Sequence, residues 1–560
     1  MLEVINRYCH GYVAVPVIVA CRAHGLFELL EQQGVLGFAA LVERLHANDG
    51  HFRVALNVLE SLGWLERDAG DAYRLTHQGA LHARVPDDVL ALLALPFDDY
   101  LRGGVPGDDC SLSAWFERSL RGWDAHDALL ADLLDGLLVP SLLLALRAPD
   151  GRDAQLGPAV LASLPEPARG EVSDYFTRRG WLEADGDAEA PALSAAGSML
   201  WARMFNAATV LSYRPMFGRI GELIFGTDGS VRAATGDGDE SHVDRTLNVQ
   251  GSGFGHQKYF GDLEAILVSI FDTEDFDAQP AYVVDMGCGD GTLLKHIYTV
   301  ITTRTRRGWA LDTHPLQLIG VDFNRKSLEE TTRTLADIPH LTLWGDIGDP
   351  RQLLADLEAA GVDDPDRILH VRTFLDHERP FREPRGEAMA VAVSGTTVHV
   401  AADGRALPEA AVNLGLAEHL HRWAGILGAH GLIVLEVHSL PPAVVRDNLD
   451  SESLHYDAFH AFSGQLLVEA TTFLDAAAAA GLFQQASSWR KYPRSLPFAR
   501  ITLSRLEKRD YRIRQVSEAD LPALLRLEAA CWPDGGGFDS SAIFRLDASR
   551  RDAALPCAPK

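Results

Sequence analysis

A glycine-rich turn after a short apolar strand constrains the fold of this chain more than any other segment. Residues 281–294 read AYVVDMGCGDGTLL, in which an apolar run ends near an acid, Asp285. Three alternating glycines follow before a helix opens: Gly287, Gly289 and Gly291. Glycine lets the backbone turn sharply and approach a ligand closely at the carboxyl end of a strand. We therefore predict an α/β domain with a Rossmann-like, doubly wound sheet and a ligand site at its carboxyl edge.

The spacing of these glycines distinguishes two classes of cofactor site. A dinucleotide fingerprint is G-x-G-x-x-G, whereas here the third glycine comes one residue earlier and an acid precedes the first by two. This D-x-G-x-G-x-G form resembles motif I of class I S-adenosylmethionine (SAM) methyltransferases. The resemblance implies that Asp285 and the three glycines line the methionine end of SAM.

Two further predicted strands end in acids. Residues 318–322 read LIGVD, and a carboxylate at Asp322 suits hydrogen bonds to both ribose hydroxyls. Residues 341–347 read LTLWGDI, and the resemblance implies that Asp346 contacts the adenine amine. A turn would also explain either acid alone, but acids at three successive strand ends favour a binding site. The predicted SAM-binding residues are Asp285, Gly287, Gly289, Gly291, Asp322, Phe323, Asp346 and Ile347.

Histidines follow the next two predicted strands, residues 367–374 and 431–438. A lone histidine at a strand end is more often a packing residue than a ligand. An oxygen methyltransferase needs only one general base. Several imidazoles together with a carboxamide and a carboxylate are better explained as ligands of a divalent metal ion. His460 and Gln465 are five residues apart, so both reach one metal only if the helix breaks between them. The predicted metal ligands are His377, His438, His460 and Gln465.

Three segments together resemble the metal-dependent carbon methyltransferases of polyketide synthase loading modules: residues 285–291, 372–381 (RTFLDHERPF) and 460–465 (HAFSGQ). In such modules, as in the apratoxin, gephyronic acid and saxitoxin pathways, an initiating methyltransferase acts with a GNAT-like decarboxylase. The resemblance implies SAM-dependent methylation of the malonyl α-carbon on acyl carrier protein, giving methylmalonyl or dimethylmalonyl. It also implies a mononuclear iron or manganese ion, which would stabilise the malonyl enolate as a Lewis acid.

The same scheme assigns roles to four more side chains. Arg372 or Arg379 would pair with the malonyl carboxylate, and His455 or Tyr456 would remove the α-proton. Two alternatives stay open. One is a metal-independent oxygen methyltransferase of small molecules, and the other is a non-catalytic winged-helix binding protein with a vestigial SAM fold.

The first third of the chain predicts helices followed by a two-stranded ribbon, the pattern of a winged helix. A Gly-Trp-Leu-Glu segment at 63–66 recurs at 180–183, and an acidic turn and an L-[TS]-x-x-G segment follow each copy. We interpret these as two tandem winged-helix-like units. The acids of the two turns, within 66–71 and 183–189, would repel phosphate, which favours a packing or lid role over nucleic-acid binding.

This organisation predicts four regions. Residues 1–100 form a winged-helix-like helical domain, 101–230 a helical insert with the second winged-helix-like unit, and 231–507 the methyltransferase core. Residues 508–560 resemble the start of a GNAT fold, with a strand and a helix over 511–528, but are too few for a complete domain. We therefore expect a downstream GNAT-like decarboxylase as a partner.

The charge balance is 51 basic against 78 acidic residues, a net charge of −27, which argues against a nucleic-acid partner. No apolar run reaches the roughly 20 residues that cross a bilayer, so we expect no membrane partner. Six scattered cysteines form no metal or disulfide motif, which fits a cytoplasmic location. Carrier proteins are themselves acidic, so docking needs a basic patch. Residues 304–307 (RTRR) are one place for it, although a solvated loop is the favoured interpretation of this cluster.

Overall fold

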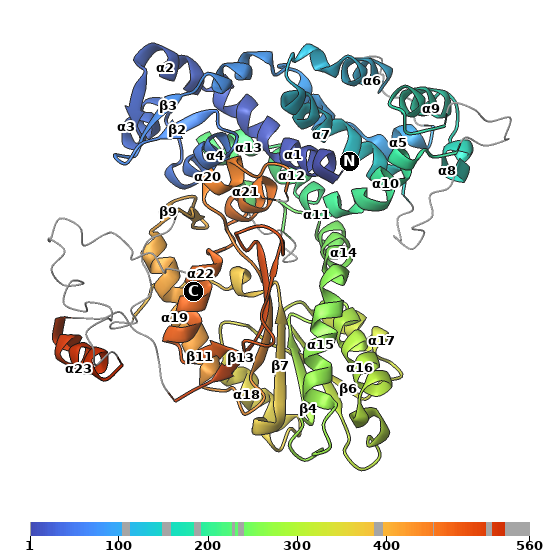
Figure 1. The fold of residues 1–560 in the computed structure, drawn as a ribbon. Helices are drawn as coiled ribbons and strands as arrows, with labels where there is room; N and C mark the ends of the chain where they lie inside the picture. Colours follow the sequence, from blue (N-terminus) through green and yellow to red (C-terminus); the bar gives the residue numbers. More distant parts are fainter. Residues whose placement is uncertain are drawn as a thin grey trace. The chain divides into compact units, whose positions relative to one another are not determined.

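The computed structural model describes residues 2–103, 112–147, 158–183, 192–226, 230–232, 240–385, 396–451, 453–510 and 518–531. It divides into two compact units (Figure 1). The helical unit comprises residues 1–263, 398–407 and 439–467, and the sheet unit comprises residues 264–397, 408–438 and 468–560. Three segments of the predicted core range, residues 231–263, 398–407 and 439–467, therefore belong to the helical unit, which a continuous boundary at residue 231 does not anticipate.

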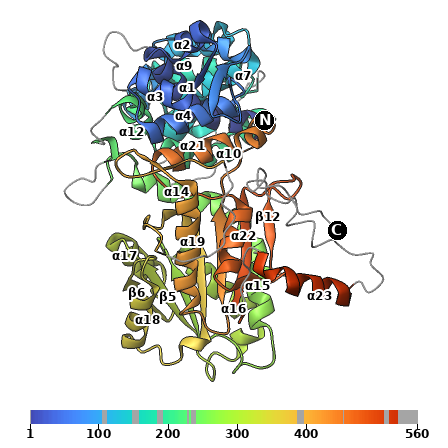
Figure 2. The same cartoon turned by 90° about the vertical axis from the view of Figure 1, so that its left-hand side faces the viewer.

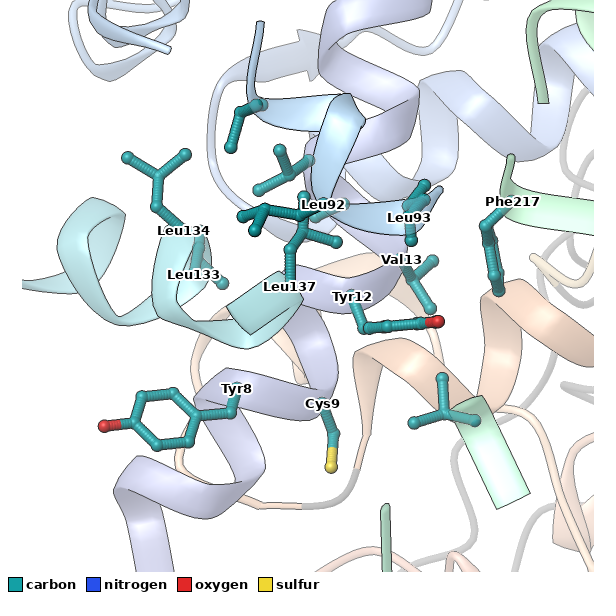
Figure 3. Close-up of a cluster of buried hydrophobic side chains, with 14 of the residues drawn as sticks. Tyr8, Cys9, Tyr12, Val13, Leu92, Leu93, Leu133, Leu134, Leu137 and Phe217 are labelled. Carbon is teal, nitrogen blue, oxygen red and sulfur yellow. The ribbon is translucent and has the colours of Figure 1, made fainter. Parts of the chain in front are cut away.

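The core of the helical unit is built on two long helices, α1 (Leu2–Ala23) and α7 (Ala128–Ala145). They pack closely because each presents a glycine to the other's backbone. A Cβ on Gly11 of α1, or on Gly136 of α7, would collide with a carbonyl group of the facing helix. Figure 3 shows buried side chains of this region, among them Tyr8, Tyr12, Leu133 and Leu137.

Both helices are long and apolar enough to cross a membrane by length and composition alone. However, 83% of the apolar window in α1 and 67% of that in α7 are buried inside the protein, as in core helices of a globular unit. Single polar residues such as Arg7 and His10 interrupt the apolar sequence of α1. A search for long continuous apolar runs therefore did not identify this helix.

Residues 26–75 have the element order of a winged helix: α2 (Leu26–Gln33), β1 (Val35–Gly37), α3 (Phe38–Leu45), α4 (Asp49–Ser61), β2 (Leu65–Arg67) and β3 (Ala72–Leu75). The three strands form an antiparallel sheet in the order β1-β3-β2. Asn48 caps α4, since its side chain accepts a hydrogen bond from the backbone N–H of His51. The carboxylate of Asp68 closes the turn between β2 and β3 by accepting from two backbone N–H groups.

The two Gly-Trp-Leu-Glu segments share one backbone geometry. Their glycines have φ angles of 72° and 70°. The backbone N–H of Trp64 donates to the carbonyl five residues earlier, and that of Trp181 does the same. Gly79 and Gly197 then pack so tightly on the carbonyl oxygens of these tryptophans that neither position admits a Cβ. The repeat in the sequence is thus a structural repeat, although the second acidic turn lies outside the described residues.

The remaining helices of the helical unit are α5 (Phe97–Leu101), α6 (Leu112–Leu120), α8 (Pro158–Ser163), α9 (Ala168–Arg178), α10 (Ala195–Met204), α11 (Ala208–Leu211), α12 (Arg214–Phe217), α13 (Ile220–Phe225), α14 (Arg245–His256), α20 (Pro442–Arg446) and α21 (Leu454–Phe462). Short 3-10 turns are η1 (Gln78–Arg84), η2 (Val89–Leu93), η3 (Gly122–Asp124), η4 (Phe205–Ala207), η5 (Ser230–Arg232) and η6 (Gln257–Tyr259). The hairpin of β8 (His399–Val400) and β9 (Ala406–Leu407) completes the unit.

The sheet unit is built on eight strands: β4 (Tyr282–Met286), β5 (Gln317–Asp322), β6 (His340–Trp344), β7 (Ile368–Thr373), β10 (Leu432–Val437), β11 (Leu482–Gln484), β12 (Arg490–Tyr492) and β13 (Ile501–Lys508). Their order is β11-β13-β10-β7-β4-β5-β6, with β12 paired to β13. Strands β4, β5, β6, β7 and β10 are parallel, and β13 is antiparallel to both neighbours. Adjacent parallel strands require crossover helices, so this order confirms the predicted Rossmann-like fold class.

Helices cover both faces of this sheet, as Figures 1 and 2 show. On one face lie α15 (Phe260–Phe271), α16 (Thr292–Arg304) and α17 (Arg325–Thr334), and on the other α18 (Pro350–Ala359), α19 (Glu409–Ala424) and α22 (Ala470–Ala479). The 3-10 turns of this unit are η7 (Arg306–Trp309), η8 (Pro365–Arg367), η9 (Asp376–Glu378) and η10 (Glu518–Asp520). Because both faces are covered, the central strands are apolar on both sides and their carboxyl edge is left for a site.

The last described element is α23 (Leu521–Cys531). It lies where the predicted GNAT-like helix was expected. The strand predicted before it falls on residues 511–517, which lie outside the described residues. The GNAT assignment of residues 508–560 stays a prediction.

Candidate functional site

The turn after β4 holds the first predicted SAM-binding residues. Gly287, Gly289 and Gly291 all have positive φ, at 82°, 55° and 79°. This conformation is readily available to glycine and costly for side chains with a Cβ. The turn leads directly into α16, so the chain changes direction within a few residues. The backbone conformation of this turn favours glycine at all three positions.

A buried carboxylate and a partly buried one, Asp285 and Asp322, lie next to this turn. Asp285 is 1% exposed, and its Oδ1 has no hydrogen-bond partner among the described residues. Burial, and then the neighbouring charge of Asp322, raises the pKa of Asp285 to about 7. The Asp322 carboxylate accepts hydrogen bonds from the backbone N–H of Gly289 (3.0 Å) and of Asn324 (2.8 Å). An orphaned buried acceptor beside a glycine turn fits a ligand that supplies a hydrogen-bond donor.

Exposed aromatic side chains border the same edge of the sheet. Phe323 is 67% exposed and Trp344, the last residue of β6, is 43% exposed. Their ring centroids are 5.4 Å apart, and Trp344 Nε1 donates to the Phe323 carbonyl at 2.8 Å. Such a pair offers flat apolar surface to a planar ring.

The loop after β6 contains the last two predicted SAM-binding residues. The Asp346 carboxylate accepts from the backbone N–H of Gly348 at 2.7 Å. Ile347 is buried, and its carbonyl accepts from Trp423 Nε1 at 3.0 Å. These bonds fix the loop, and a contact of Asp346 with adenine stays a prediction.

The segment after β7 packs against the glycine turn. Phe374 has a φ of 52°, which is unusual for a bulky residue and marks a strained backbone position. Leu375 follows, and a Cβ on Gly287 would lie only 2.9 Å from its Cδ2. The sheet unit thus brings the RTFLDHERPF segment next to the SAM-like motif.

A buried ion-pair network begins at Arg372. Its Nε lies 2.9 Å from Asp376 Oδ2, and His419 Nε2 lies 3.2 Å from Asp376 Oδ1. Burial opposes ionisation of Asp376, but Arg372, His419 and Arg379 together outweigh it and hold the pKa of Asp376 below its ordinary value. The guanidinium of Arg372 lies 4.5 Å from the Trp423 ring centroid, and its Nη1 and Nη2 have no hydrogen-bond partner in the described part of the chain.

Glu436 of β10 joins this network from the neighbouring strand. Its Oε2 accepts from the backbone N–H of Asp376 at 2.7 Å. Its Oε1 accepts from the backbone N–H of Val437 at 2.8 Å and lies 2.7 Å from His377 Nδ1. Burial disfavours the charged imidazole, but Glu436 outweighs that effect and raises the pKa of His377. The His377 ring is therefore oriented by a carboxylate.

Two more predicted residues of the sheet unit are buried. Arg379 follows Asp376 in the sequence, and His438 follows Glu436. Arg379 donates from Nη1 to the Asp376 carbonyl at 2.8 Å, and burial lowers the pKa of Arg379 to about 10. His438 is fully buried with its Nε2 2.8 Å from Thr502 Oγ1. Burial lowers the pKa of His438 to about 3, so its imidazole is neutral.

The predicted bases lie on α21, in the helical unit. His455 Nδ1 is 3.0 Å from His10 Nδ1, and His10 Nε2 is 3.0 Å from the Leu449 carbonyl. Since a carbonyl only accepts, His10 carries its hydrogen on Nε2, and His455 donates from Nδ1. The ring of Tyr456 lies beside that of His455, with centroids 4.7 Å apart.

The predicted break after His460 is confirmed. Helix α21 ends at Phe462, and Gly464 has a φ of 77°. His460 Nδ1 lies 2.6 Å from the Tyr456 carbonyl, and Ser463 Oγ donates to Gln465 Oε1 at 3.2 Å.

The four predicted metal ligands divide evenly between the units, with His377 and His438 in the sheet unit and His460 and Gln465 in the helical unit. His377 and His460 are each held through Nδ1, as metal-binding imidazoles commonly are. However, no three His, Cys, Asp or Glu side chains of the described residues gather around a point that suits an ion. The predicted ligands described within either unit alone do not form a metal site. No step of the reaction is therefore assigned to a metal ion.

The basic cluster at residues 304–307 is partly paired with acids and partly buried, and its use as a docking patch stays a prediction. Arg304 pairs with Glu264, and Arg306 pairs with Glu274 at 2.9 Å. Arg307 is fully buried, where it donates hydrogen bonds to backbone carbonyls and a glutamine. Acidic partners thus neutralise the exposed arginines, and the third one is structural.

Sequence reasoning missed three residues of this site. Glu436 is an acid inside the apolar strand segment GLIVLEVH, and a charge in a buried strand signals a paired, buried group. His419 lies on the buried face of α19 at helical spacing from Leu416 and Trp423. Trp344 carries no local signal beyond its position at a strand end.

Three family models match the chain in order along the sequence. The AprA N-terminal domain matches residues 1–67, the AprA winged helix domain matches residues 135–227, and the AprA MT2-like domain matches residues 240–504. Together they cover most of the chain, and all three describe domains of one kind of methyltransferase. No protein with curated function matches the chain.

Solved methyltransferases of low identity also align with the chain. An O-methyltransferase family 2 protein from Planctomyces limnophilus, solved with apigenin, is 12% identical over 90% of this chain and 95% of that one, with a TM-score of 0.37. An O-methyltransferase family protein from Burkholderia thailandensis is 16% identical over 68% and 97%, with a TM-score of 0.38. An O-methyltransferase from neocarzinostatin biosynthesis, solved with S-adenosylhomocysteine, is 14% identical over 90% and 96%, with a TM-score of 0.27. These scores are too low to carry an argument, so the assignment rests on the family models and the strand order.

Proposed function

We propose that this chain, which belongs to the AprA-like family of SAM-dependent methyltransferases, methylates the α-carbon of a malonyl group carried by an acyl carrier protein. The observation that carries the proposal is the match of three AprA domain models in order along one chain. The substrate and the carbon acceptor are our inference from the segments that resemble loading-module methyltransferases, residues 372–381 and 460–465.

The glycine turn and the acids behind it would hold SAM. Asp285 offers an unpartnered buried oxygen to the ammonium of the methionine end, and Asp322 lies where a ribose would present its hydroxyls. Phe323 and Trp344 offer apolar surface to the adenine ring. SAM supplies an electrophilic methyl group on a sulfonium.

The RTFLDHERPF segment would bind the acyl substrate. Arg372 forms an ion pair through Nε with Asp376, and its Nη1 and Nη2 have no hydrogen-bond partner among the described residues. Two parallel N–H groups of a guanidinium match the geometry of a carboxylate. We therefore assign the malonyl carboxylate to Arg372, with Arg379 as the alternative.

Removal of the α-proton requires a base. We assign this role to His455, whose Nδ1 lies 3.0 Å from His10 Nδ1. Once a base has taken the α-proton, the resulting carbanion would take the methyl group as the carbon–sulfur bond of the sulfonium breaks. Tyr456 stays the alternative base.

Iron or manganese assistance stays a proposal from the family resemblance. The cytoplasmic location and the partnership with a GNAT-like decarboxylase are likewise proposals. None of them is needed for the steps assigned above to named residues.

The test is mass spectrometry of malonyl-loaded carrier protein after incubation with the full chain and SAM. We expect the acyl group to gain the mass of one or two methyl groups while the carboxylate is retained. A chain that binds SAM but leaves malonyl unmodified, with and without added Fe²⁺ or Mn²⁺, would refute carbon methylation of this substrate.

One observation favours a second candidate, oxygen methylation of a small molecule. His377 with its Glu436 partner is an imidazole–carboxylate pair, which suits removal of a proton from a hydroxyl group. Methylation of a phenol or alcohol, unaffected by chelators and stronger than that of malonyl carrier protein, would support this candidate instead.

A further inference from the structure

A single threonine of α17 packs against the glycine turn that follows β4. All ten residues of α17 belong to the described part of the chain, and Thr331 alone among them is buried, with 0% of its surface exposed. A helix that covers a sheet usually buries a stripe of apolar side chains along one face. Here the buried position carries a hydroxyl group instead, and its polar contacts show why.

The hydroxyl group of Thr331 bonds outside its own helix. Its Oγ1 donates to the carbonyl of Gly289 at 3.0 Å. A helical threonine commonly donates to the carbonyl four residues earlier, as the neighbouring Thr332 does to Leu328 at 2.9 Å. Because a carbonyl only accepts, the hydroxyl hydrogen of Thr331 points to Gly289. The Cys288 thiol, whose Sγ lies 3.3 Å from Thr331 Oγ1, is then the donor in the second contact.

Gly289 is thereby held through both of its backbone polar groups. Its N–H donates to the Asp322 carboxylate at 3.0 Å, and its carbonyl accepts from Thr331. Asp322 ends β5, and Thr331 lies on α17, the helix that follows this strand. The segment from β5 to α17 therefore fixes the two peptide groups that flank Gly289, in the middle of the predicted SAM-binding turn.

The carbon atoms of Thr331 make a separate contact with two other glycines. A Cβ on Gly291 would lie 3.0 Å from Thr331 Cα, and a Cβ on Gly320 would lie 2.9 Å from Thr331 Cγ2. These glycines leave the space that Thr331 occupies. The hydroxyl group thus holds a carbonyl, whereas the methyl group fills space. Valine at this position keeps the methyl group and loses the hydroxyl group, and serine does the reverse.

We propose that Thr331 is a positioning residue for SAM, because its hydroxyl group holds the Gly289 carbonyl and so keeps the turn and the Asp322 carboxylate in the arrangement that binds the cofactor. Thr331 is fully buried, so it acts through Gly289 rather than by touching SAM. A turn that is already fixed binds with a smaller loss of conformational freedom. The inference rests on the placement of SAM at the glycine turn in the proposed function, and not on malonyl as the methyl acceptor.

The test compares Thr331→Val and Thr331→Ser in the full chain by calorimetric titration with S-adenosylhomocysteine and by thermal unfolding. Thr331→Val lacks the donor, so its affinity should fall roughly threefold to tenfold, as for the loss of one hydrogen bond. Thr331→Ser keeps the donor and should bind like the unmodified chain, although the lost methyl group lowers its midpoint of unfolding. Thr332→Val, at an exposed threonine of the same helix, is the matched control and should bind normally.

A merely structural role predicts a different result, in which affinity follows the midpoint of unfolding in both variants. Equal affinity in Thr331→Val and the unmodified chain, or an equal loss in Thr331→Ser, overturns the proposal, and so does an unmodified chain that does not bind S-adenosylhomocysteine. If Thr331→Val does not fold, Thr331→Ala takes its place, and affinity equal to that of Thr331→Ser overturns the proposal. Malonyl left unmethylated by a chain that binds S-adenosylhomocysteine would refute the proposed function alone.

Discussion

The backbone N–H of Gly289 donates a hydrogen bond to the Asp322 carboxylate, with 3.0 Å between N and Oδ2. This bond ties the glycine turn after β4 to the end of β5. It fixes the two parts of the predicted SAM site that lie on different strands. Loss of the negative charge at Asp322 should therefore loosen the turn as well as remove the acceptor for a ribose.

Asp322→Asn is expected to weaken binding of S-adenosylhomocysteine by roughly tenfold to a hundredfold, since hydrogen bonds to charged groups are worth about 1.5–3 kcal/mol. Calorimetric titration of the purified chain measures this. Asp337→Asn, at an exposed acid of the same unit, is the control and should bind normally. Equal affinity of both variants would contradict the assignment of Asp322.

Asp285 should make stability depend on pH. Its pKa is raised from 3.8 to about 7 by burial and by Asp322, so the folded state binds more protons than the unfolded state between these values. Stability contributed at this residue is therefore lost as pH rises from about 4 to 7. In Asp285→Asn the midpoint of thermal unfolding should fall less between pH 5 and pH 8 than in the unmodified chain. The same pH slope in both proteins would show that Asp285 is not held in a shifted state.

Glu436→Gln should impair methyl transfer more than SAM binding. The Glu436 carboxylate accepts hydrogen bonds from two backbone N–H groups and contacts His377. A neutral amide in its place is a weaker acceptor for these buried donors. We expect a destabilisation of about 1–3 kcal/mol and at least a tenfold loss of activity, with affinity for S-adenosylhomocysteine nearly unchanged. Glu358→Gln, on the exposed side of α18, should leave both activity and stability unchanged. A parallel loss of cofactor affinity in Glu436→Gln would place Glu436 in the cofactor site instead.

The structural repeat of the helical unit predicts matched effects of two substitutions. Gly79→Ala and Gly197→Ala each place a methyl group against a tryptophan carbonyl, which should cost about 1–3 kcal/mol of stability by overpacking. Gly253→Ala, in α14 with open space around it, should instead be neutral or stabilising. Unfolding followed by circular dichroism measures all three. A harmless Gly197→Ala would mean that the second copy is not packed like the first.

Chelation should leave cofactor binding intact. The predicted SAM-binding residues share no member with the predicted metal ligands, and the described residues hold no cluster of three ligands within them. Affinity for S-adenosylhomocysteine is therefore expected to be the same before and after treatment with EDTA. A large loss of affinity would show that an ion supports the cofactor site itself, whereas loss of methyl transfer alone would support metal assistance at the acceptor.

Much of the sheet unit was predictable because its signals are local. The strands that precede Gly287, Phe323 and Gly345 are short apolar runs, and each ends close to the acid or glycine that identifies it. Positive φ at the turn glycines follows from the residues themselves, whatever surrounds them. The same holds for the Gly-Trp-Leu-Glu repeat, in which each copy closes its own turn through bonds to residues a few positions away.

The partners of the buried polar groups were not predictable in this way. Asp376 and Glu436 are 60 residues apart, and His10 and His455 are 445 residues apart. No periodicity links such positions, since their pairing depends on which strands and helices pack together. The burial of Arg307 is a similar case, because the two arginines before it, Arg304 and Arg306, are not buried.

The sequence by itself determined the class of this protein: a Rossmann-like methyltransferase fold with a glycine turn and acids at strand ends, after a helical region with a repeated turn. Those features are set by backbone conformations and side-chain patterns over a few residues. The tertiary structure alone decided which charges meet, that Arg372 and His377 are held by Asp376 and Glu436, and that α21 belongs to the helical unit. Burial makes those pairings strong, and burial is a property of the packed chain rather than of any one segment.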